Sequence, residues 1–430
     1  MNNSRDRVFL IGVLWGSEDK EHFEETMDEL KHLADTAETE VVEVFIQSLK
    51  RPNTSTYIGK GKLKEIANAA NSKSVRTLIF NNNLSPSQSR NISDATRCNV
   101  VDRTELILDI FAKHARTRQA KLQVELAQLE YAYTKLKRMW KHLSRIQGGI
   151  GFRGPGETQI EVDRREIRKK TQILKKKIDH IESTSKTKRK RRKNITSIAL
   201  VGYTNAGKST LFNKLANEKR YVADQLFATL DAKTRSIYLE SGEKVVITDT
   251  IGFIRQLPHK LVNSFHTTLM EVIEADLLLH VVDVTHPSVT ELINSVHSVL
   301  EEINSHENDI LLIFNKIDKA GGNHFKFVKK HLVNEFPDSV FISAKTGEGM
   351  NILFKKIEEF LKKSKNSIKL EIPSEMKNLI SFIYGNADVL EDKYIPEKHL
   401  NVLVVKIPRQ LLPNIKKQIE EFKLKKYIES

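Results

Sequence analysis

The residues with the clearest chemical potential form a glycine-rich loop, Gly202 to Ser209, with the sequence GYTNAGKS. The loop fits the phosphate-loop pattern GxxxxGK(S/T), and it lies between an apolar run, ITSIALV, and a helical pattern, TLFNKLAN. Backbone N–H groups in such a loop wrap a β-phosphate, and the following helix directs its positive end toward it. We therefore expect Lys208 to reach the β- and γ-phosphates and Ser209 to ligate magnesium.

Three shorter motifs follow later strand patterns: residues 249–252 (DTIG), 315–318 (NKID) and 343–345 (SAK). We expect the first to add Asp249 to the magnesium shell and a Gly N–H to the γ-phosphate. Asp318 can accept two hydrogen bonds from guanine, whereas adenine would leave its carboxylate unpaired. The stem of Lys316 can lie on the base plane, and the Ala344 N–H can meet guanine O6.

The four motifs, in this order and each at a strand's carboxyl end, resemble those of Ras-like P-loop GTPases. We expect hydrolysis of GTP to GDP and phosphate, with Lys208, Thr229 and Gly252 as catalytic residues. The predicted GTP-binding residues are Gly202, Tyr203, Thr204, Asn205, Ala206, Gly207, Lys208, Ser209, Thr210, Phe227, Thr229, Asp249, Thr250, Ile251, Gly252, Asn315, Lys316, Asp318, Ser343, Ala344 and Lys345. The predicted magnesium ligands are Ser209, Thr229 and Asp249.

Three residues decide how hydrolysis would proceed. Thr229, between the phosphate loop and Asp249, resembles the switch threonine that completes the magnesium shell only with triphosphate; the alternative is an ordinary loop threonine. Phe253 stands where Ras-like enzymes usually carry a water-orienting glutamine, so we expect slow turnover unless something else orders the water. Asn205 resembles the asparagine that holds potassium in several potassium-stimulated GTPases; bracing of the loop is the alternative.

The hydrophobic patterns divide the chain into four regions. Alternating strand and helix patterns predict a small N-terminal α/β domain (1–103), a GTPase domain (194–366) and a small C-terminal α/β domain (367–430). The last is expected as strand, helix, strand, helix, ending with LLPNIKKQIEEF. Residues 104–193 instead read as a long helical hairpin with a glycine-rich tip and a basic linker.

Two heptad stripes define the hairpin, one from Leu122 to Leu143 and one from Ile167 to Ile181. They face each other if the glycine-rich segment Gly148–Gly156 (GGIGFRGPG) breaks the helix between them. The block Lys186–Lys193 is expected to be a flexible connector, because its like charges repel one another. The hairpin should therefore carry the glycine-rich segment at its tip.

The composition favours an intracellular protein that binds a polyanion. The net charge is +15, and Cys98 is the only cysteine, so disulfides within the chain are impossible and a reducing cytoplasm is indicated. The single cysteine and the scattered histidines show no zinc-binding spacing. No apolar run reaches the about 18 residues of a membrane span, so membrane insertion is not expected.

The segment Gly148–Arg165, GGIGFRGPGETQIEVDRR, closely resembles the HflX family of ribosome-associated GTPases. Tyr57–Ile66, Val100–Leu129, the phosphate loop and DTIGFIRQLP resemble it too, so the similarity covers about residues 1–350. The resemblance implies binding to the large ribosomal subunit and its RNA, ribosome-stimulated hydrolysis, and splitting or rescue of stalled ribosomes under stress. We also expect a monomer in the cytoplasm, with peripheral membrane association left open.

The tip is the part of this resemblance with a physical rationale. Glycines permit close backbone approach to RNA, and Arg153 can pair with phosphate or stack on a base. We expect the ribosome contacts at Gly149, Arg153, Gly154 and Gly156. The alternative is a helix reversal, for which about two to five residues suffice. Other functions left open are a GTPase of ribosome assembly or RNA modification, and an RNA-binding or anti-association module whose GTP site only changes its shape.

Overall fold

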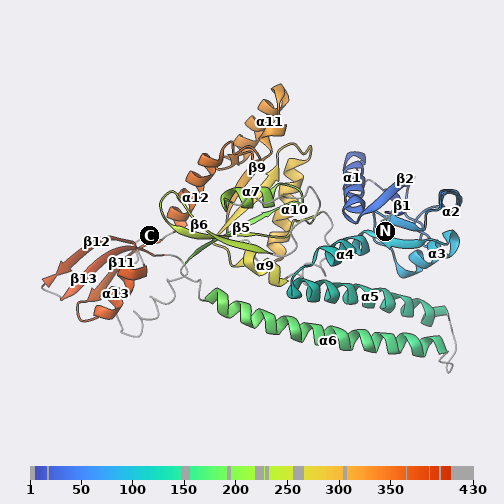
Figure 1. The fold of residues 1–430 in the computed structure, drawn as a ribbon, viewed down its shortest axis with the longest axis horizontal. Helices are drawn as coiled ribbons and strands as arrows, with labels where there is room; N and C mark the ends of the chain where they lie inside the picture. The colour runs from blue at the N-terminus through green and yellow to red at the C-terminus, as the bar shows by residue number, and fades with distance from the viewer. Residues whose placement is uncertain are drawn as a thin grey trace.

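The computed structural model places four groups of elements along the chain (Figure 1). It describes residues 5–16, 19–146, 155–190, 195–217, 227, 232–254, 266–303, 308–364, 366–386, 388–396 and 399–407. An N-terminal α/β unit, a helical hairpin, a central α/β domain and a C-terminal α/β unit follow one another, which confirms the predicted fold class.

The N-terminal unit is a parallel sheet with the strand order β2-β1-β3-β4, covered by helices on both faces. Alternation along β1 sorts the core: Val8 and Leu10 pack with α1 and α4, whereas Phe9 and Ile11 pack with α2 and α3. The elements are β1 (Asp6–Trp15), α1 (Lys20–Thr36), β2 (Thr39–Leu49), α2 (Lys60–Lys73), β3 (Thr77–Phe80), α3 (Pro86–Thr96), β4 (Asn99–Asp102) and α4 (Arg103–His114).

Helix α4 packs with this unit, although the sequence analysis places its residues in the hairpin region. Its residues Leu106, Ile107 and Phe111 are buried in the core that α1 shares with the sheet. The hairpin itself consists of α5 (Arg118–Ile146) and α6 (Pro155–Lys190). Leu126 packs against Leu174 and Ile178, so the two predicted stripes do face each other along this part of the hairpin.

Two features of the hairpin differ from expectation. The break between the two helices is predicted to extend to Gly156. Helix α6 already begins at Pro155, so Gly156 lies in its first turn. Proline suits the first helical position, since its missing N–H has no partner there in any case. The described part of the basic block, residues 186–190, is helical rather than a flexible connector, because α6 continues through Lys190; lysine and arginine are good helix formers.

The central domain is a six-stranded sheet with the strand order β10-β9-β8-β5-β7-β6, in which β6 alone runs antiparallel to its neighbour. Its strands are β5 (Thr196–Gly202), β6 (Lys233–Tyr238), β7 (Lys244–Asp249), β8 (Leu277–Asp283), β9 (Asp309–Asn315) and β10 (Val340–Phe341). Its helices are α7 (Lys208–Leu215), α9 (His266–Ile273), α10 (Val289–Glu302), η1 (Ile317–Lys319), α11 (Gly322–Glu335) and α12 (Met350–Ser364). The carboxyl ends of β5, β7, β9 and β10 bring the four motifs to one edge of the sheet.

The C-terminal unit contains a strand that the sequence analysis missed. The antiparallel order is β11-β13-β12, with β11 (Asn366–Pro373), α13 (Lys377–Asn386), β12 (Asp388–Ile395) and β13 (Leu400–Ile407). β12 carries the polar sequence DVLEDKYI, so pairing with β13 rather than an apolar pattern defines it. The predicted last helix, LLPNIKKQIEEF, lies outside the described residues.

Candidate nucleotide site

The phosphate loop joins β5 to α7 in a conformation that only glycine tolerates at two places. Gly202 has φ +143°, and a Cβ there would lie 2.2 Å from the Val281 carbonyl oxygen. Gly207 has φ +97°, and a Cβ there would lie 2.2 Å from Asn315 Nδ2. The loop therefore turns tightly against β8 and β9 and presents its backbone at the start of α7, as anion binding requires.

Lys208 is buried within this loop. Its Nζ donates hydrogen bonds to the carbonyl oxygens of Gly202 at 3.0 Å and Tyr203 at 2.7 Å. Burial lowers the pKa of the Lys208 ammonium to about 8, although the nearby Asp249 carboxylate raises it. The ammonium group is thus held inside the loop, where a bound phosphate would compensate the desolvation.

Two oxygen atoms that could bind a metal ion lie side by side next to the phosphate loop. Ser209 Oγ donates to Asp249 Oδ2 at 2.7 Å, which brings the first helical turn after the loop to the end of β7. Thr250 Oγ1 donates to the Leu200 carbonyl oxygen at 2.6 Å and fixes the strand end beside β5. A hydroxyl and a carboxylate are oxygen ligands of the kind that Mg²⁺ binds, so these residues fit the predicted ion.

Gly252 is packed closely against the loop. A Cβ on it would lie 2.8 Å from Thr204 Cγ2 and 3.0 Å from Lys208 Nζ. Phe253, the next residue, pairs its backbone with residues 202–204, and its buried ring packs in the core under α9 and α10. The ring therefore lies in the core and offers no group to water at the phosphates; the slow turnover expected from the sequence stays a prediction.

Asn315 joins the phosphate loop to the base-recognition loop. Its Nδ2 donates to the Ala206 carbonyl oxygen at 2.9 Å, and its Oδ1 accepts from the Ala344 N–H at 2.9 Å. Asp318 Oδ1 accepts from Ser343 Oγ at 2.6 Å. These contacts place Asp318 and the SAK segment next to each other, as recognition of one base requires.

Asp283, which ends β8, is a site residue that none of the sequence motifs includes. Its Oδ2 lies 2.7 Å from Lys316 Nζ, and this pair fixes the lysine whose stem was expected to cover the base. Lys316 has φ +68°, so its backbone is also held in the left-handed region. An aspartate at the carboxyl end of a strand between two motif-bearing strands was the available signal.

The structure gathers most of the predicted nucleotide residues at one edge of the sheet. The described members are residues 202–210, 249–252, 315, 316, 318 and 343–345. Phe227 is described but is directed elsewhere: its ring packs edge-on against Phe111 of α4, with centroids 4.6 Å apart. Thr229 lies outside the described residues, as do Gly149, Arg153 and Gly154.

The N-terminal unit packs against the nucleotide site. Ile251 and Ile254 lie in the same buried cluster as residues of α1 and α4. Tyr203 directs its hydroxyl away from the phosphate loop to Glu29 of α1. A cavity of about 380 Å³ lies between α1 and residues 203–206, 283, 286 and 287. Within the part of the chain that the structure describes, no helix is long and apolar enough to cross a membrane.

A Ras-like sheet with a phosphate loop, an aspartate-bearing strand end and a guanine-type recognition loop defines a P-loop GTPase. Three family descriptions match the chain: "GTP-binding GTPase N-terminal" over residues 24–112, "GTP-binding GTPase Middle Region" over 114–192 and "50S ribosome-binding GTPase" over 197–316. They follow the order of the observed units.

Known relatives narrow the class. GTPase HflX of Caldanaerobacter subterraneus subsp. tengcongensis is 42% identical over 405 residues, covering 93% of this chain and 90% of that protein. GTPase HflX of Escherichia coli is 42% identical over 386 residues, covering 89% and 90%. The chain belongs to the HflX family, and it is a GTPase. A solved GTP-binding protein of Sulfolobus solfataricus, in complex with GDP, is 28% identical, with a TM-score of 0.44 over 83% of this chain and 99% of that one.

Proposed function

We propose that this chain, with GTP and Mg²⁺ bound, binds the large ribosomal subunit and splits or rescues stalled ribosomes. The ribosome would in turn stimulate hydrolysis, and the protein would act as a monomer in the cytoplasm. The family description matched by residues 197–316, "50S ribosome-binding GTPase", supports the choice of partner.

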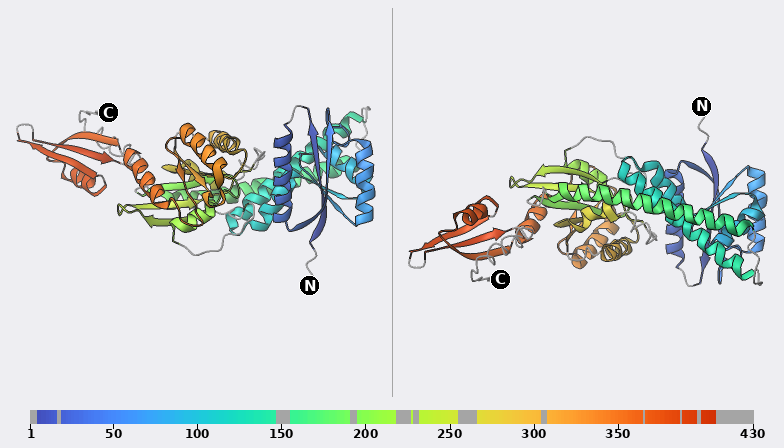
Figure 2. Two further views of the ribbon diagram at one scale, coloured as in Figure 1. Left: turned by 90° about the horizontal axis from the view of Figure 1, so that it is seen from above. Right: turned by 90° about the horizontal axis from the view of Figure 1, so that it is seen from below.

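The observation that carries the proposal is the helical hairpin. Its arms have 29 and 36 residues, or about 43 and 54 Å by helical rise. The arm ends that flank the tip lie beneath the N-terminal unit, whereas the other end of α6 lies beneath the central domain (Figures 1 and 2). An arm of this length can carry the tip into a narrow RNA channel while the GTPase domain stays outside.

The described surface of α6 is strongly basic. Between Arg164 and His180 its only acidic residues are Glu166 and Asp179. The exposed basic residues of this stretch are Arg165, Arg168, Lys169, Lys170, Lys175, Lys176 and Lys177. Such a surface attracts RNA phosphates without regard to sequence, and salt screens that attraction. The hairpin would therefore supply affinity along its length and its specific effect at its tip.

At the nucleotide, Ser209, Asp249 and Thr229 would hold Mg²⁺, which neutralises charge on the β- and γ-phosphates when bound. Lys208 would contact the same phosphates, while the Asp318 carboxylate and the Ala344 N–H would select guanine. The chain places Phe253 in the core instead of a water-orienting side chain at the phosphates. Contact with the ribosome would therefore have to order the attacking water or the segment that holds it.

Subunit splitting tests the proposal directly. A variant with residues 148–154 replaced by a short glycine–serine turn should keep GTP binding and lose splitting in gradient sedimentation. Lys169→Ala with Lys170→Ala is the matched control, because it should weaken ribosome binding in a salt-dependent way and keep splitting at saturation. If the loop variant splits ribosomes as well as the parent, the tip is only a connector. If the parent binds no large subunit with a non-hydrolysable GTP analogue, assembly or RNA modification becomes the better hypothesis.

A further inference from the structure

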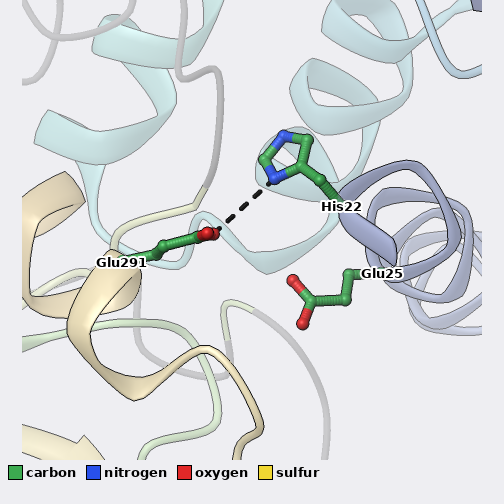
Figure 3. Close-up of side chains that lie close together, drawn as sticks. All are labelled: His22, Glu25 and Glu291. Atoms are coloured by element: carbon green, nitrogen blue, oxygen red, sulfur yellow. Dashed lines mark ion pairs between the residues drawn. The ribbon is translucent and has the colours of Figure 1, made fainter. Parts of the chain in front are cut away.

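We propose that His22, Glu25 and Glu291 bind one divalent metal ion of the zinc class between the N-terminal unit and the GTPase domain. The ligand atoms of these three residues all lie within 4.8 Å of one another. His22 and Glu25 come from α1, and Glu291 reaches them from the first turn of α10 (Figure 3). The site is independent of the nucleotide and of the proposed action on ribosomes.

The spacing within α1 suits metal binding. Residues three apart on a helix lie on the same face, so the His22 imidazole and the Glu25 carboxylate both point toward α10. In helical bundles a glutamate and a histidine three residues apart, in the order Glu-x-x-His, form metal sites; here the order is reversed. The sequence shows no zinc-binding spacing because the third ligand, Glu291, lies far away in the chain, in a different domain.

The distance between His22 and Glu291 fits two ligands on one ion. His22 Nδ1 lies 3.7 Å from Glu291 Oε2, which is too long for a hydrogen bond. Two ligands of a tetrahedral ion with bonds of about 2.0–2.2 Å are about 3.4 Å apart. A small movement of the exposed Glu291 side chain, which is 60% exposed, would close the difference. Water can complete the tetrahedron.

A neighbouring contact orients one ligand. Ser288 Oγ donates to Glu25 Oε1 at 2.5 Å, so the hydroxyl fixes the carboxylate from the GTPase side of the boundary. Hydrogen bonds of this kind set the direction of metal-binding carboxylates. One imidazole nitrogen with two carboxylates suits zinc and neighbouring divalent transition metals better than the oxygen-only preference of Mg²⁺. The ion would also neutralise two carboxylates that otherwise repel each other across the boundary.

Zinc binding to the full chain tests the assignment. The chelator-treated protein, with GDP and excess Mg²⁺ to occupy the nucleotide site, is dialysed against Zn²⁺, and bound zinc is counted by elemental analysis. We expect one zinc per chain, and at least about a tenfold loss of affinity in Glu291→Gln and in Glu25→Gln. Co²⁺ should give a visible absorption band in the parent that both variants lose. Zinc should also raise the thermal midpoint of the parent but not that of Glu291→Gln.

The matched control is His331→Ala, which removes a second histidine–glutamate pair. His331 Nδ1 lies 3.6 Å from Glu335 Oε2, and this pair is not part of any three-residue cluster among the described residues. Its loss should leave zinc binding unchanged. Glu291→Gln keeps the shape of an exposed side chain, so loss of binding in it does not reflect unfolding, and circular dichroism checks this. The proposal is overturned if the parent binds no stoichiometric zinc, which leaves an ion pair only, or if Glu291→Gln binds zinc like the parent.

Discussion

Tyr203 of the phosphate loop donates its hydroxyl to Glu29 Oε1 of α1 at 2.5 Å. The other oxygen of Glu29 accepts from Arg103 Nη2 at 2.6 Å, and the Arg103 and Glu29 side chains are only 4% and 10% exposed. The next residue back, Asp102, accepts from the Tyr131 hydroxyl of α5. These side-chain contacts, joined through the backbone between Asp102 and Arg103, therefore connect the phosphate loop through the N-terminal unit to the hairpin.

The Tyr203–Glu29 contact should contribute measurably to the docking of the N-terminal unit. Hydrogen bonds to charged groups contribute about 1.5–3 kcal/mol. We expect a double-mutant cycle of Tyr203→Phe and Glu29→Gln, measured by urea unfolding, to show a coupling of at least about 1 kcal/mol. Tyr203→Phe alone should also increase hydrogen exchange in α1, since it removes only the hydroxyl. Tyr238→Phe, on an exposed strand residue, is the control. Additive effects of the two substitutions would show that the contact does not couple the units.

Asp318→Asn should change base preference from guanosine toward xanthosine triphosphate. The amide would keep an oxygen for the Ser343 hydroxyl, which donates to Asp318 Oδ1 at 2.6 Å, and would present an N–H group to the base. Xanthine offers a carbonyl where guanine offers an amine. Competition binding against labelled GDP measures the change, with Asp338→Asn as a control on an exposed carboxylate. Unchanged affinity for guanine nucleotides, with no gain for xanthine, would refute the assignment of Asp318.

His280 should make the GTPase domain sensitive to acid. It is fully buried in β8 beside His297, neither ring nitrogen has a hydrogen-bond partner among the described residues, and burial lowers the pKa of His280 to about 3. In the unfolded chain the His280 imidazole has a pKa of about 6.5. Below that pH the unfolded chain therefore binds a proton at His280 that the folded chain does not. The contribution of neutral His280 to the free energy of unfolding is therefore complete above pH 6.5. It is lost progressively as the pH falls toward 3, the pKa of His280 in the folded chain.

Comparing urea unfolding at pH 7 and pH 4.5 measures that effect. Between these values the parent should lose about 2–3 kcal/mol more than His280→Leu, because two pH units below the unfolded pKa correspond to that difference. His331→Gln, on an exposed histidine, should behave like the parent. Equal losses in the parent and in His280→Leu would mean that His280 takes up its proton without cost in the folded chain.

Residues that act through the local backbone were predictable from sequence, and residues that act across domains were not. The phosphate-loop glycines and Asp318 belong to short motifs whose chemistry depends on their own loop and on one strand end. Glu29 accepts a hydrogen bond from Tyr203, which lies 174 positions away in the sequence, and no sequence periodicity predicts such a pair. The same limit applies to β12, whose polar sequence becomes a strand only because β13 pairs with it.

Asn205 could either bind a cation or brace the phosphate loop. Substitutions that change its side-chain amide but keep its backbone conformation can distinguish the two roles. Asn205 has φ +61°, its side chain is exposed, and the amide makes no hydrogen bond with other described residues. Both interpretations therefore stay predictions, and substitution can separate them. Asn205→Gly keeps the left-handed conformation and removes only the amide, whereas Asn205→Asp keeps an oxygen donor at the same place. Intrinsic GTP hydrolysis is measured in K⁺ and in Na⁺ at equal ionic strength.

We expect K⁺ to accelerate the slow hydrolysis of the parent, because Phe253 supplies no group to the attacking water. The acceleration should disappear in Asn205→Gly, while GTP affinity changes less than about threefold, since the backbone N–H groups and Lys208 remain. Asn205→Asp should retain part of it. If Asn205→Gly responds to K⁺ like the parent, the amide holds no cation. If the parent is fast and indifferent to both K⁺ and ribosomes, another group must orient the water, and the role inferred from the buried Phe253 ring is wrong.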